Sequence, residues 1–285
     1  MKIGCVIVLY NPDKELLERA ISLIKEQVDT ICLVDNTPSP ISINIECSTK
    51  VVYYAMNGNR GIAAAQNRGV RYFIKQNFDF VFYLDQDSIP PRNIIDSLLK
   101  HYFCLLSNNI IVGAVGPRAF NRCENKEYKG SVKKGKKIND EITEVSELIS
   151  SASLIAISNF EKAGLMDEEL FIDGVDHEWC WRVNSKMNGR FFIVETVKLS
   201  HHLGEGDRYF LWKKVPIPTP FRTYYQFRNY FILLRRDYVP TYWKVSNGIK
   251  YVIKLFYYPL CISPRLLYLK KIAMGIRDGI FYKKI

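Results

Sequence analysis

Two carboxylates stand one residue apart in the run Asp85-Gln86-Asp87. They directly follow the apolar residues 80–84, which we expect to form a buried strand. A D-x-D triplet on a surface loop is usually two solvated acids, whereas two carboxylates at the end of a buried strand gather hard oxygen ligands at one point. Mg²⁺ and Mn²⁺ prefer such ligands. The triplet therefore predicts a Mg²⁺ or Mn²⁺ site that would neutralise a diphosphate.

Two further acids, Asp173 and Asp176, lie at the start of a helix predicted over 176–187. Their spacing is that of an N-cap residue and the third residue of a helix, so one interpretation is a capping arrangement. The functional interpretation is that an acid at the helix start projects into a cleft as a general base, because a helix N-terminus keeps a carboxylate ionised. Both interpretations can hold together. Glu178 and Arg182 are spaced to form an ion pair on the same helix.

Two other segments combine turn residues or histidines with the ends of predicted elements. A glycine-bearing turn over 57–61 opens a helix with small first residues, so Arg60 and the helix N-terminus could face an anion, although an ordinary capped helix has the same pattern. His201 and His202 follow the last predicted strand, in a chain with four histidines. One of them would be a metal ligand or a diphosphate contact, unless one is held structurally and the other is exposed.

The elements that must position these groups alternate between strand and helix. Apolar runs predict strands at 2–9, 30–35, 50–54, 79–84 and 110–115, and helical periodicity appears at 13–27, 61–76 and 92–103. Strands separated by single helices predict an α/β fold with a mostly parallel sheet that is covered on both faces. Ligands of such sheets bind at the carboxyl ends of the strands. Tyr10-Asn11, Asp35-Asn36 and the D-x-D triplet stand at those ends.

The second half of the predicted sheet is less regular. Residues 117–147 are basic and contain glycine, with little apolar periodicity, which indicates a hairpin or an excursion from the sheet. A strand at 153–157, a short helix at 159–163, the helix at 176–187 and a strand at 190–194 follow. With 285 residues, of which 48% are hydrophobic, the chain is long enough for one large domain or one domain plus an appendage.

The positive charge lies at the C-terminal end. Of the net +11, residues 208–285 carry 16 Lys and Arg against two acids, while the rest of the chain has 24 basic and 27 acidic residues. Uncharged runs in this region are about ten residues, short of the ~20 that span a bilayer. Apolar and basic residues alternate instead, which is typical of helices that lie on an anionic membrane. A basic helical cap on the core is the alternative. Nucleic-acid binding ranks lower, because no nucleic-acid motif accompanies the charge.

The seven cysteines include no C-x-x-C pair, and their number is odd. A zinc site or a disulfide framework is therefore not expected, and a reducing cytosol is the natural compartment. The run 1–10 is too short for a signal peptide and is interpreted as a first strand.

Taken in order, these segments resemble the bacterial rhamnosyltransferases of glycosyltransferase family 2, which have the GT-A fold. The resemblance runs from residue 2 to residue 236. It is carried by Tyr10-Asn11-Pro12, Val34-Asp35-Asn36, Asn59 with Gly61, Asn67 with Gly69, Leu84-Asp85-Gln86-Asp87, Val115-Gly116-Pro117, Phe171-Ile172-Asp173, the run Asp176–Arg182, His201-His202-Leu203-Gly204, and Tyr224-Tyr225 through Arg228-Asn229.

The resemblance implies an inverting transfer in a single displacement. Asp176 would take the proton of an acceptor hydroxyl, with Asp173 next in line, although Val175 stands where many relatives have a glutamate. Arg182 or His201 would stabilise the negative charge of the nucleoside diphosphate that leaves. No protein nucleophile is needed for this route.

The resemblance also implies a donor site. Asp87 would bind the metal, Asp85 would act through the metal or the ribose, and His201 would be the third ligand, favoured over His202 by its spacing to Gly204. Asp35 would contact the edge of the base. The expected donor-binding residues are Tyr10, Asn11, Asp35, Asn36, Arg60, Gly61, Asn67, Asp85 and Arg182.

The function so implied is transfer of L-rhamnose from dTDP-L-rhamnose to a lipid-linked glycan for a cell-surface polysaccharide, by a cytoplasmic enzyme peripheral to the inner face of the cell membrane. Residues 1–207 would form the GT-A domain, with a donor half at 1–117 and an acceptor half at 118–207, and 208–285 a membrane-associating helical region. The alternatives are a different nucleotide sugar (galactose, glucose or N-acetylhexosamine), a nucleotidyltransferase, or a non-catalytic membrane or nucleic-acid binding protein. A nucleotidyltransferase is disfavoured because no Gly-rich loop follows the first strand.

Overall fold

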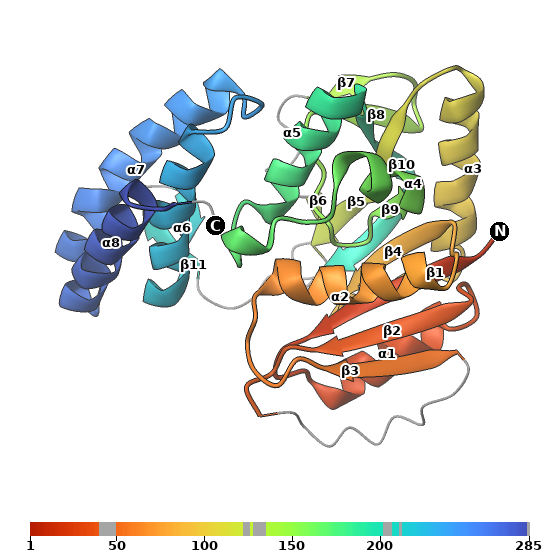
Figure 1. Cartoon of the computed structure of the whole chain (residues 1–285), viewed down its shortest axis with the longest axis horizontal. Helices are drawn as coiled ribbons and strands as arrows, with labels where there is room; N and C mark the ends of the chain where they lie inside the picture. The colour runs from red at the N-terminus through yellow and green to blue at the C-terminus, as the bar shows by residue number, and fades with distance from the viewer. Residues whose placement is uncertain (40–49, 122–125, 128–134, 202–206, 211–212, 284–285) are drawn as a thin grey trace.

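A computed structural model of the chain describes residues 1–39, 50–121, 126–127, 135–201, 207–210 and 213–283. Its centre is one large sheet, in which the strands follow the order β3-β2-β1-β4-β9-β5-β10-β8-β7. Helices cover both faces of this sheet, and a group of three C-terminal helices lies beside it (Figure 1). The predicted α/β class is confirmed.

The N-terminal half of the sheet is parallel, as expected. It contains β1 (Ile3–Leu9), β2 (Thr30–Asp35), β3 (Val51–Ala55) and β4 (Phe80–Asp85). In the register of these strands, Leu9 pairs with Asp35 and Val8 pairs with Asp85. The carboxyl ends of β1, β2 and β4 therefore meet at one edge of the sheet.

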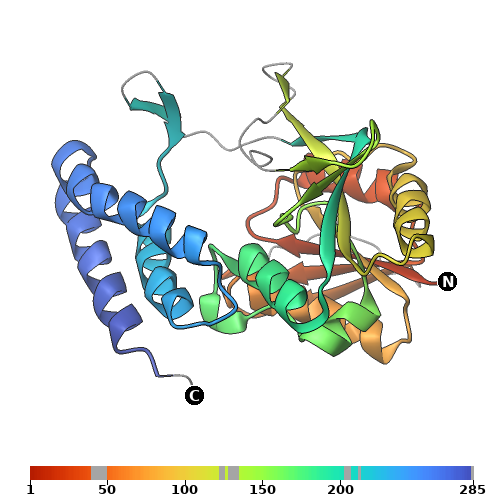
Figure 2. The same cartoon turned by 90° about the horizontal axis from the view of Figure 1, so that it is seen from above.

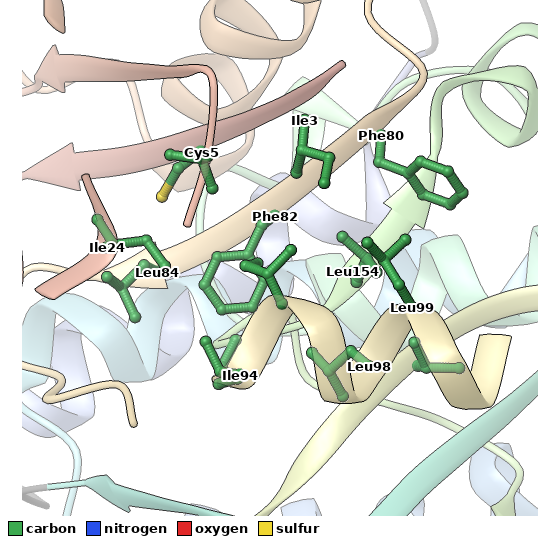
Figure 3. Close-up of a cluster of buried hydrophobic side chains, with 14 of the residues drawn as sticks. Ile3, Cys5, Ile24, Phe80, Phe82, Leu84, Ile94, Leu98, Leu99 and Leu154 are labelled. Carbon is green, nitrogen blue, oxygen red and sulfur yellow. The ribbon is translucent and has the colours of Figure 1, made fainter. Parts of the chain in front are cut away.

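Two hydrophobic clusters fix this sheet between helices. One face packs against α1 (Lys14–Ile24) and α3 (Ile94–Ser107), and the other face packs against α2 (Ile62–Lys75). Figure 3 shows the first face, where Phe82 of β4 lies close to Ile94 and Leu98 of α3. Alternate residues of each buried strand face different helices, which explains why these strands appear in the sequence as continuous apolar runs.

The C-terminal half of the sheet is mixed. Here β5 (Val112–Asn121) runs parallel to β10 (Arg190–His201), but β9 (Leu154–Ala156) is antiparallel to both β4 and β5. The short strands β6 (Lys126–Glu127), β7 (Lys136–Lys137) and β8 (Ile142–Val145) also pair antiparallel. A parallel pair needs a crossover, usually a helix, and the sequence between β5 and β9 has no helical periodicity. The expected hairpin over 117–147 is present in part, as β6 against β5.

Two helices and a 3₁₀ turn follow β9 on the face that carries α2. They are α4 (Ile157–Ala163), η1 (Glu168–Leu170) and α5 (Val175–Met187). Helix α5 starts after Gly174, which has a left-handed φ of 88° and no capping side chain. The capping interpretation of Asp173 was therefore wrong, and its carboxylate has another partner.

The C-terminal region continues with a hairpin of β11 (Asp207–Phe210) and β12 (Lys213–Pro216) and then three helices. These are α6 (Pro220–Leu234), α7 (Thr241–Cys261) and α8 (Arg265–Ile280), which lie side by side (Figures 1 and 2). Ile232 and Leu233 of α6 belong to the same buried cluster as α5. The expected division at residue 207 would therefore separate α6 from α5, with which it shares this buried cluster. Among the described helices, none is both long and apolar enough to cross a bilayer.

Candidate active site

A cleft of about 590 Å³ lies at the carboxyl edge of the parallel strands. One wall comes from the sheet edge and the start of α2, and the other comes from the segment before α5 and the start of α6. Its lining residues are Val8, Tyr10, Asn36, Asn59, Gly61, Ile62, Gln86, Phe171, Ile172, Thr219, Phe221 and Arg222. A volume within the range of 300–1,000 Å³ suits a ligand as large as a nucleotide.

The D-x-D triplet lies at this edge, and Gln86 fixes it. The Gln86 side chain accepts a hydrogen bond from the Tyr10 N–H (2.8 Å) and donates one to the Tyr10 carbonyl (3.1 Å). The Ser88 N–H donates to the Asp85 carbonyl at 3.1 Å and closes the turn. Asp85 and Asp87, both half-buried, therefore leave β4 on a loop that is tied to the end of β1.

The carboxylate oxygens of the triplet are suitable ligands for a divalent cation. Within the described ranges no cluster of three or more His, Cys, Asp or Glu side chains forms a site for an ion. Mg²⁺ in nucleotide sites is typically held by one or two carboxylates together with phosphate oxygens and waters, so Asp85 and Asp87 are a sufficient protein contribution. His201 is the last residue of β10, but its side chain and the whole of His202 lie outside the described part of the chain.

Asp35 is fully buried beneath the cleft. Its two carboxylate oxygens accept hydrogen bonds from the Thr37 N–H (2.9 Å) and the Tyr53 hydroxyl (2.7 Å). Burial and the bond to Asp35 both raise the pKa of Tyr53. To contact the edge of a nucleotide base, Asp35 would have to share these oxygens between the base and their present partners. In the structure, Asp35 holds the loop that contains Thr37. Thr37 in turn accepts a bond from the Asn11 N–H (3.1 Å).

Asn36 connects the end of β2 to the turn before α2. Its side chain donates to Asn59 Oδ1 (3.1 Å) and accepts from the Arg60 N–H (2.7 Å). Gly61, with φ 87°, approaches the second wall so closely that an added Cβ would lie 2.6 Å from the Phe171 carbonyl oxygen. The Ile62 N–H donates to the same oxygen at 2.8 Å. Arg60 is exposed beside this junction.

The segment before α5 has an unusual backbone that α6 supports. Phe171 and Asp173 have positive φ angles of 63° and 64°. The Asn229 side chain of α6 donates to the carbonyls of Ile172 (2.8 Å) and Asp173 (2.9 Å), and Phe171 stacks on Tyr225 with ring centroids 4.5 Å apart. Helix α6 thus holds the segment that forms the second wall.

Arg222 of α6 pairs with Asp173 through both of its carboxylate oxygens, at 2.5 Å and 3.2 Å. Because Arg222 lines the cleft, this pair places one cation at its edge. Sequence reasoning missed Arg222 and Phe221 as cleft residues and assigned no separate role to Gln86 within the triplet. Gln86 had a visible signal, since it stands between the two acids, but nothing in the sequence indicates that α6 folds back onto the segment before α5.

Asp176 lies in the first turn of α5, half-buried, on the side that faces Ser150. Burial raises the pKa of Asp176 above its ordinary value, although the charge of His177 and hydrogen bonds from the Ser150 N–H and hydroxyl oppose this shift. The Ser150 hydroxyl also accepts a bond from Gln66 Nε2 (2.9 Å). A carboxylate with a raised pKa is a stronger base, which suits general-base chemistry.

Two expected donor-binding residues, Arg182 and Asn67, have partners within the protein and do not line the cleft. Arg182 is bound by Glu178 (2.7 Å and 2.9 Å) and by the carbonyls of Ala163 and Leu165 (each 2.7 Å), so it anchors α5 to the end of α4. This confirms the expected pair with Glu178, and Arg182 is not among the residues that line the cleft.

Asn67 is only 1% exposed. Its side-chain amide donates a hydrogen bond to the Met166 carbonyl (2.8 Å) and accepts one from the Met166 N–H (2.9 Å). It therefore joins α2 to the segment before η1, away from the cleft lining. The pattern that suggested a ligand contact reflects packing between these two segments.

The family of the chain follows from comparison with known proteins. Residues 5–142, which contain the D-x-D triplet and the turn before α2, match the family described as glycosyl transferase family 2. The chain is also 32% identical, over 290 aligned residues, to the dTDP-rhamnosyl transferase RfbF of Shigella flexneri, and the match covers 98% of this chain and 95% of that protein. The chain therefore belongs to glycosyltransferase family 2 and is a glycosyltransferase.

Solved structures confirm the GT-A fold. TarS (residues 1–349) of S. aureus has a TM-score of 0.59 at 10% identity and matches 99% of this chain and 81% of its own. GalNAc-T7, crystallised with UDP, GalNAc and Mn²⁺, has a TM-score of 0.57 at 14% identity, and this chain spans 58% of its length.

Proposed function

We propose that the chain transfers L-rhamnose from dTDP-L-rhamnose to a hydroxyl of a lipid-linked saccharide, with inversion and with Mg²⁺ or Mn²⁺. The observation that carries this proposal is the cleft at the carboxyl edge of β1, β2 and β4, which the D-x-D triplet and Arg222 flank. Similarity to the Shigella rhamnosyl transferase supports the choice of sugar and nucleotide.

The donor would lie across this edge. Tyr10, Asn36 and Gly61 line the nucleotide part of the cleft, and Asp85 and Asp87 would hold the cation. A bound divalent cation neutralises the charge that develops on the diphosphate. In this proposal Arg222, and not Arg182, stabilises the negative charge of the diphosphate, because the Arg222 guanidinium lies at the cleft and is half exposed.

Asp176 is the general base in this proposal. As the acceptor oxygen forms its bond to the anomeric carbon, Asp176 takes the hydroxyl proton, and the bond from that carbon to the diphosphate oxygen breaks on the opposite face. Asp173 is the second candidate, but Arg222 already engages both of its carboxylate oxygens. The raised pKa of Asp176, caused mainly by burial, supports this order.

Thermal unfolding with dTDP, with and without Mn²⁺, tests the donor site. Ligand at 100 times its Kd stabilises a fold by about 2.7 kcal/mol. We expect dTDP to raise the Tm of the wild type in a metal-dependent way, Asp87→Ala to lose the metal-dependent part, and Asp96→Ala, an exposed acid on α3, to keep it. Equal metal-dependent stabilisation of Asp87→Ala and wild type would contradict the metal site.

The sugar is tested by single-turnover hydrolysis of dTDP-rhamnose beside UDP-glucose, UDP-galactose and UDP-N-acetylglucosamine. Preference for dTDP-rhamnose is the expected result. A preference for a UDP-sugar would keep the glycosyltransferase and replace the proposed donor.

The proposed cellular place is the inner face of the membrane, where a lipid-linked acceptor is available. Helix α7 has an exposed apolar stripe of Val245, Ile249, Val252, Ile253, Phe256 and Leu260. Exposed cations near it include Lys250 on α7 and Arg265 and Lys270 on α8. An apolar stripe flanked by Lys and Arg is the composition of a helix that lies in an anionic interface.

A further inference from the structure

A second cavity, of about 240 Å³, lies on the other side of the Asp173–Arg222 ion pair. It is formed by the N-terminus of α5 together with α6 and α7. Its lining residues are Asp173, Gly174, His177, Gln226, Asn229, Tyr230, Leu233, Trp243, Asn247, Tyr251 and Lys254. Arg222 lines the donor cleft and Asp173 lines this cavity, so the ion pair marks the boundary between the two.

The size of the cavity limits what it can hold. Pockets for drug-sized ligands are about 300–1,000 Å³, a range that includes the donor cleft but not this smaller cavity. A single sugar ring is small enough to enter it, whereas a complete nucleotide sugar is not.

The walls of the cavity combine aromatic rings with hydrogen-bonding groups. Tyr230 lies between Trp243 and Tyr251, with ring centroids 6.0 Å and 4.8 Å away. Gln226 and Asn247 add amide groups. Rings can pack against the C–H faces of a pyranose, and amides can both donate to and accept from its hydroxyls. A purely apolar or a purely anionic ligand would leave one of these sets unused.

Lys254 supplies donors that the protein leaves available. Its half-buried ammonium group donates one hydrogen bond to Gln226 Oε1, at 3.2 Å, and lies 5.1 Å from the Tyr251 ring centre. No ion pair to Lys254 is formed by the described residues. An ammonium group has three donors, so two remain for a ligand as far as the described residues are concerned. Burial lowers the pKa of Lys254, although the nearby charge of Asp173 opposes this shift.

Helix α7 separates this cavity from the membrane-facing stripe. At 100° per residue, the residues at 243, 247, 251 and 254 form one face of the helix, and the exposed apolar stripe forms the opposite face. The cavity is therefore a distinct feature of the molecule and is not part of the apolar surface.

We propose that this cavity binds a sugar ring of the acceptor, with Lys254, Gln226 and Asn247 as hydrogen-bonding partners and Trp243 and Tyr251 as ring walls. The proposal rests on the proposed glycosyl transfer. It places acceptor recognition on α6 and α7, in the region after residue 207, and not in residues 118–207.

The test uses methyl glycosides as probes, namely those of L-rhamnose, D-glucose, D-galactose and N-acetyl-D-glucosamine. Their binding to the full chain is followed by tryptophan fluorescence, because Trp243 lines the cavity. Lys254→Met removes the donors and Asn247→Leu fills the space. Lys250→Met is the matched control, since it removes the same charge from an exposed position on the same helix. We expect at least one glycoside to bind saturably, with its Kd raised tenfold or more in both cavity variants and unchanged in the control.

Adding saturating dTDP with Mn²⁺ to the same experiment distinguishes glycoside binding in this cavity from binding in the donor cleft. Glycoside binding should persist in its presence, because the nucleotide occupies the other cleft. The inference is overturned if no glycoside binds saturably, if both cavity variants bind as wild type does, or if dTDP displaces the glycoside. Failure of the proposed function has a different signature, namely that dTDP with Mn²⁺ stabilises neither the wild type nor the cavity variants.

Discussion

Asp173 and Asp176 are only three positions apart in the sequence but have different surroundings. Asp173 gives both carboxylate oxygens to Arg222, whereas Asp176 is held by Ser150 and has a pKa raised mainly by burial. Two nearby carboxylates whose environments differ in this way are suited to different tasks. The raised pKa of Asp176 suits the proposed general base, and Asp173 pairs with Arg222 at the boundary between the two cavities.

Replacement of the base tests this assignment. Asp176→Asn should lower rhamnosyl transfer by about two orders of magnitude or more, the scale of lost general-base catalysis, and keep dTDP binding. In the wild type, kcat should rise with pH as Asp176 loses its proton, with a midpoint above the ordinary pKa of an aspartate because burial raises it. Stopped transfer assays across pH measure both. Near-wild-type turnover of the variant would move the base to Asp173 or elsewhere.

Ser150 should set the position of that midpoint. Its hydroxyl bond to Asp176 stabilises the charged carboxylate and lowers its pKa, so Ser150→Ala should shift the acidic limb of the pH–rate profile to higher pH. Ser151→Ala is the control, because the buried Ser151 hydroxyl has no hydrogen-bond partner among the residues that the structure describes. A variant that lowers kcat equally at every pH would show that Ser150 supports the fold and does not tune the base.

Sequence reasoning succeeded at residues whose role depends on position along an element. Asp85 ends β4 and Asp176 lies in the first turn of α5, each within one residue of the predicted place. Arg182 and Asn67 have main-chain partners that were not predicted, because a polar residue in a conspicuous pattern has the same appearance whether its partner is a ligand or a main-chain carbonyl. Only the folded contact distinguishes these two uses.

At the scale of elements, β1 to β4 and α2 were predicted almost to the residue. Strands buried on both faces give continuous apolar runs, and the ends of such runs are sharp. The strands between 117 and 147 were not individually predicted, since β6 and β7 are two residues long and charged. The position of α6 was also missed, because helical periodicity shows that one face is buried but not against which partner.

The junction of α2 with the segment before α5 should depend on Gly61. Gly61→Ala would place a Cβ 2.6 Å from the Phe171 carbonyl at φ 87°, so overpacking of ~1–3 kcal/mol adds to a backbone penalty of ~1–2 kcal/mol. Gly58→Ala is the control, since its φ is 136° but no atom of the described residues lies within 4 Å of the added Cβ. Chemical denaturation should show a greater loss of stability for Gly61→Ala, together with weaker dTDP binding. Equal losses in the two variants would contradict the close approach.

At the scale of the whole molecule, the proposed function gives the C-terminal helices two roles. Helix α6 completes the donor cleft and joins the core, while α7 and α8 carry exposed apolar and basic side chains. Removing residues 208–285 would therefore damage the active site and test nothing about membranes. Substitutions on the exposed stripe of α7 separate the two functions, because that stripe lies opposite the face that lines the smaller cavity.

The last prediction concerns that stripe. Ile249 and Phe256 are 60% and 62% exposed. Replacing both with glutamate should remove binding to anionic vesicles and leave dTDP binding intact, because the substitution puts negative charge where apolar area would enter the membrane interface. Leu106→Glu is the control, at an apolar residue of α3 that is 47% exposed. In vesicle flotation, wild-type binding should weaken as salt rises, since the Debye length falls from ~10 Å at 0.1 M to ~3 Å at 1 M. The apolar contribution is not screened, so binding should persist in part. If the wild type does not float with anionic vesicles at low salt, the stripe does not bind membranes.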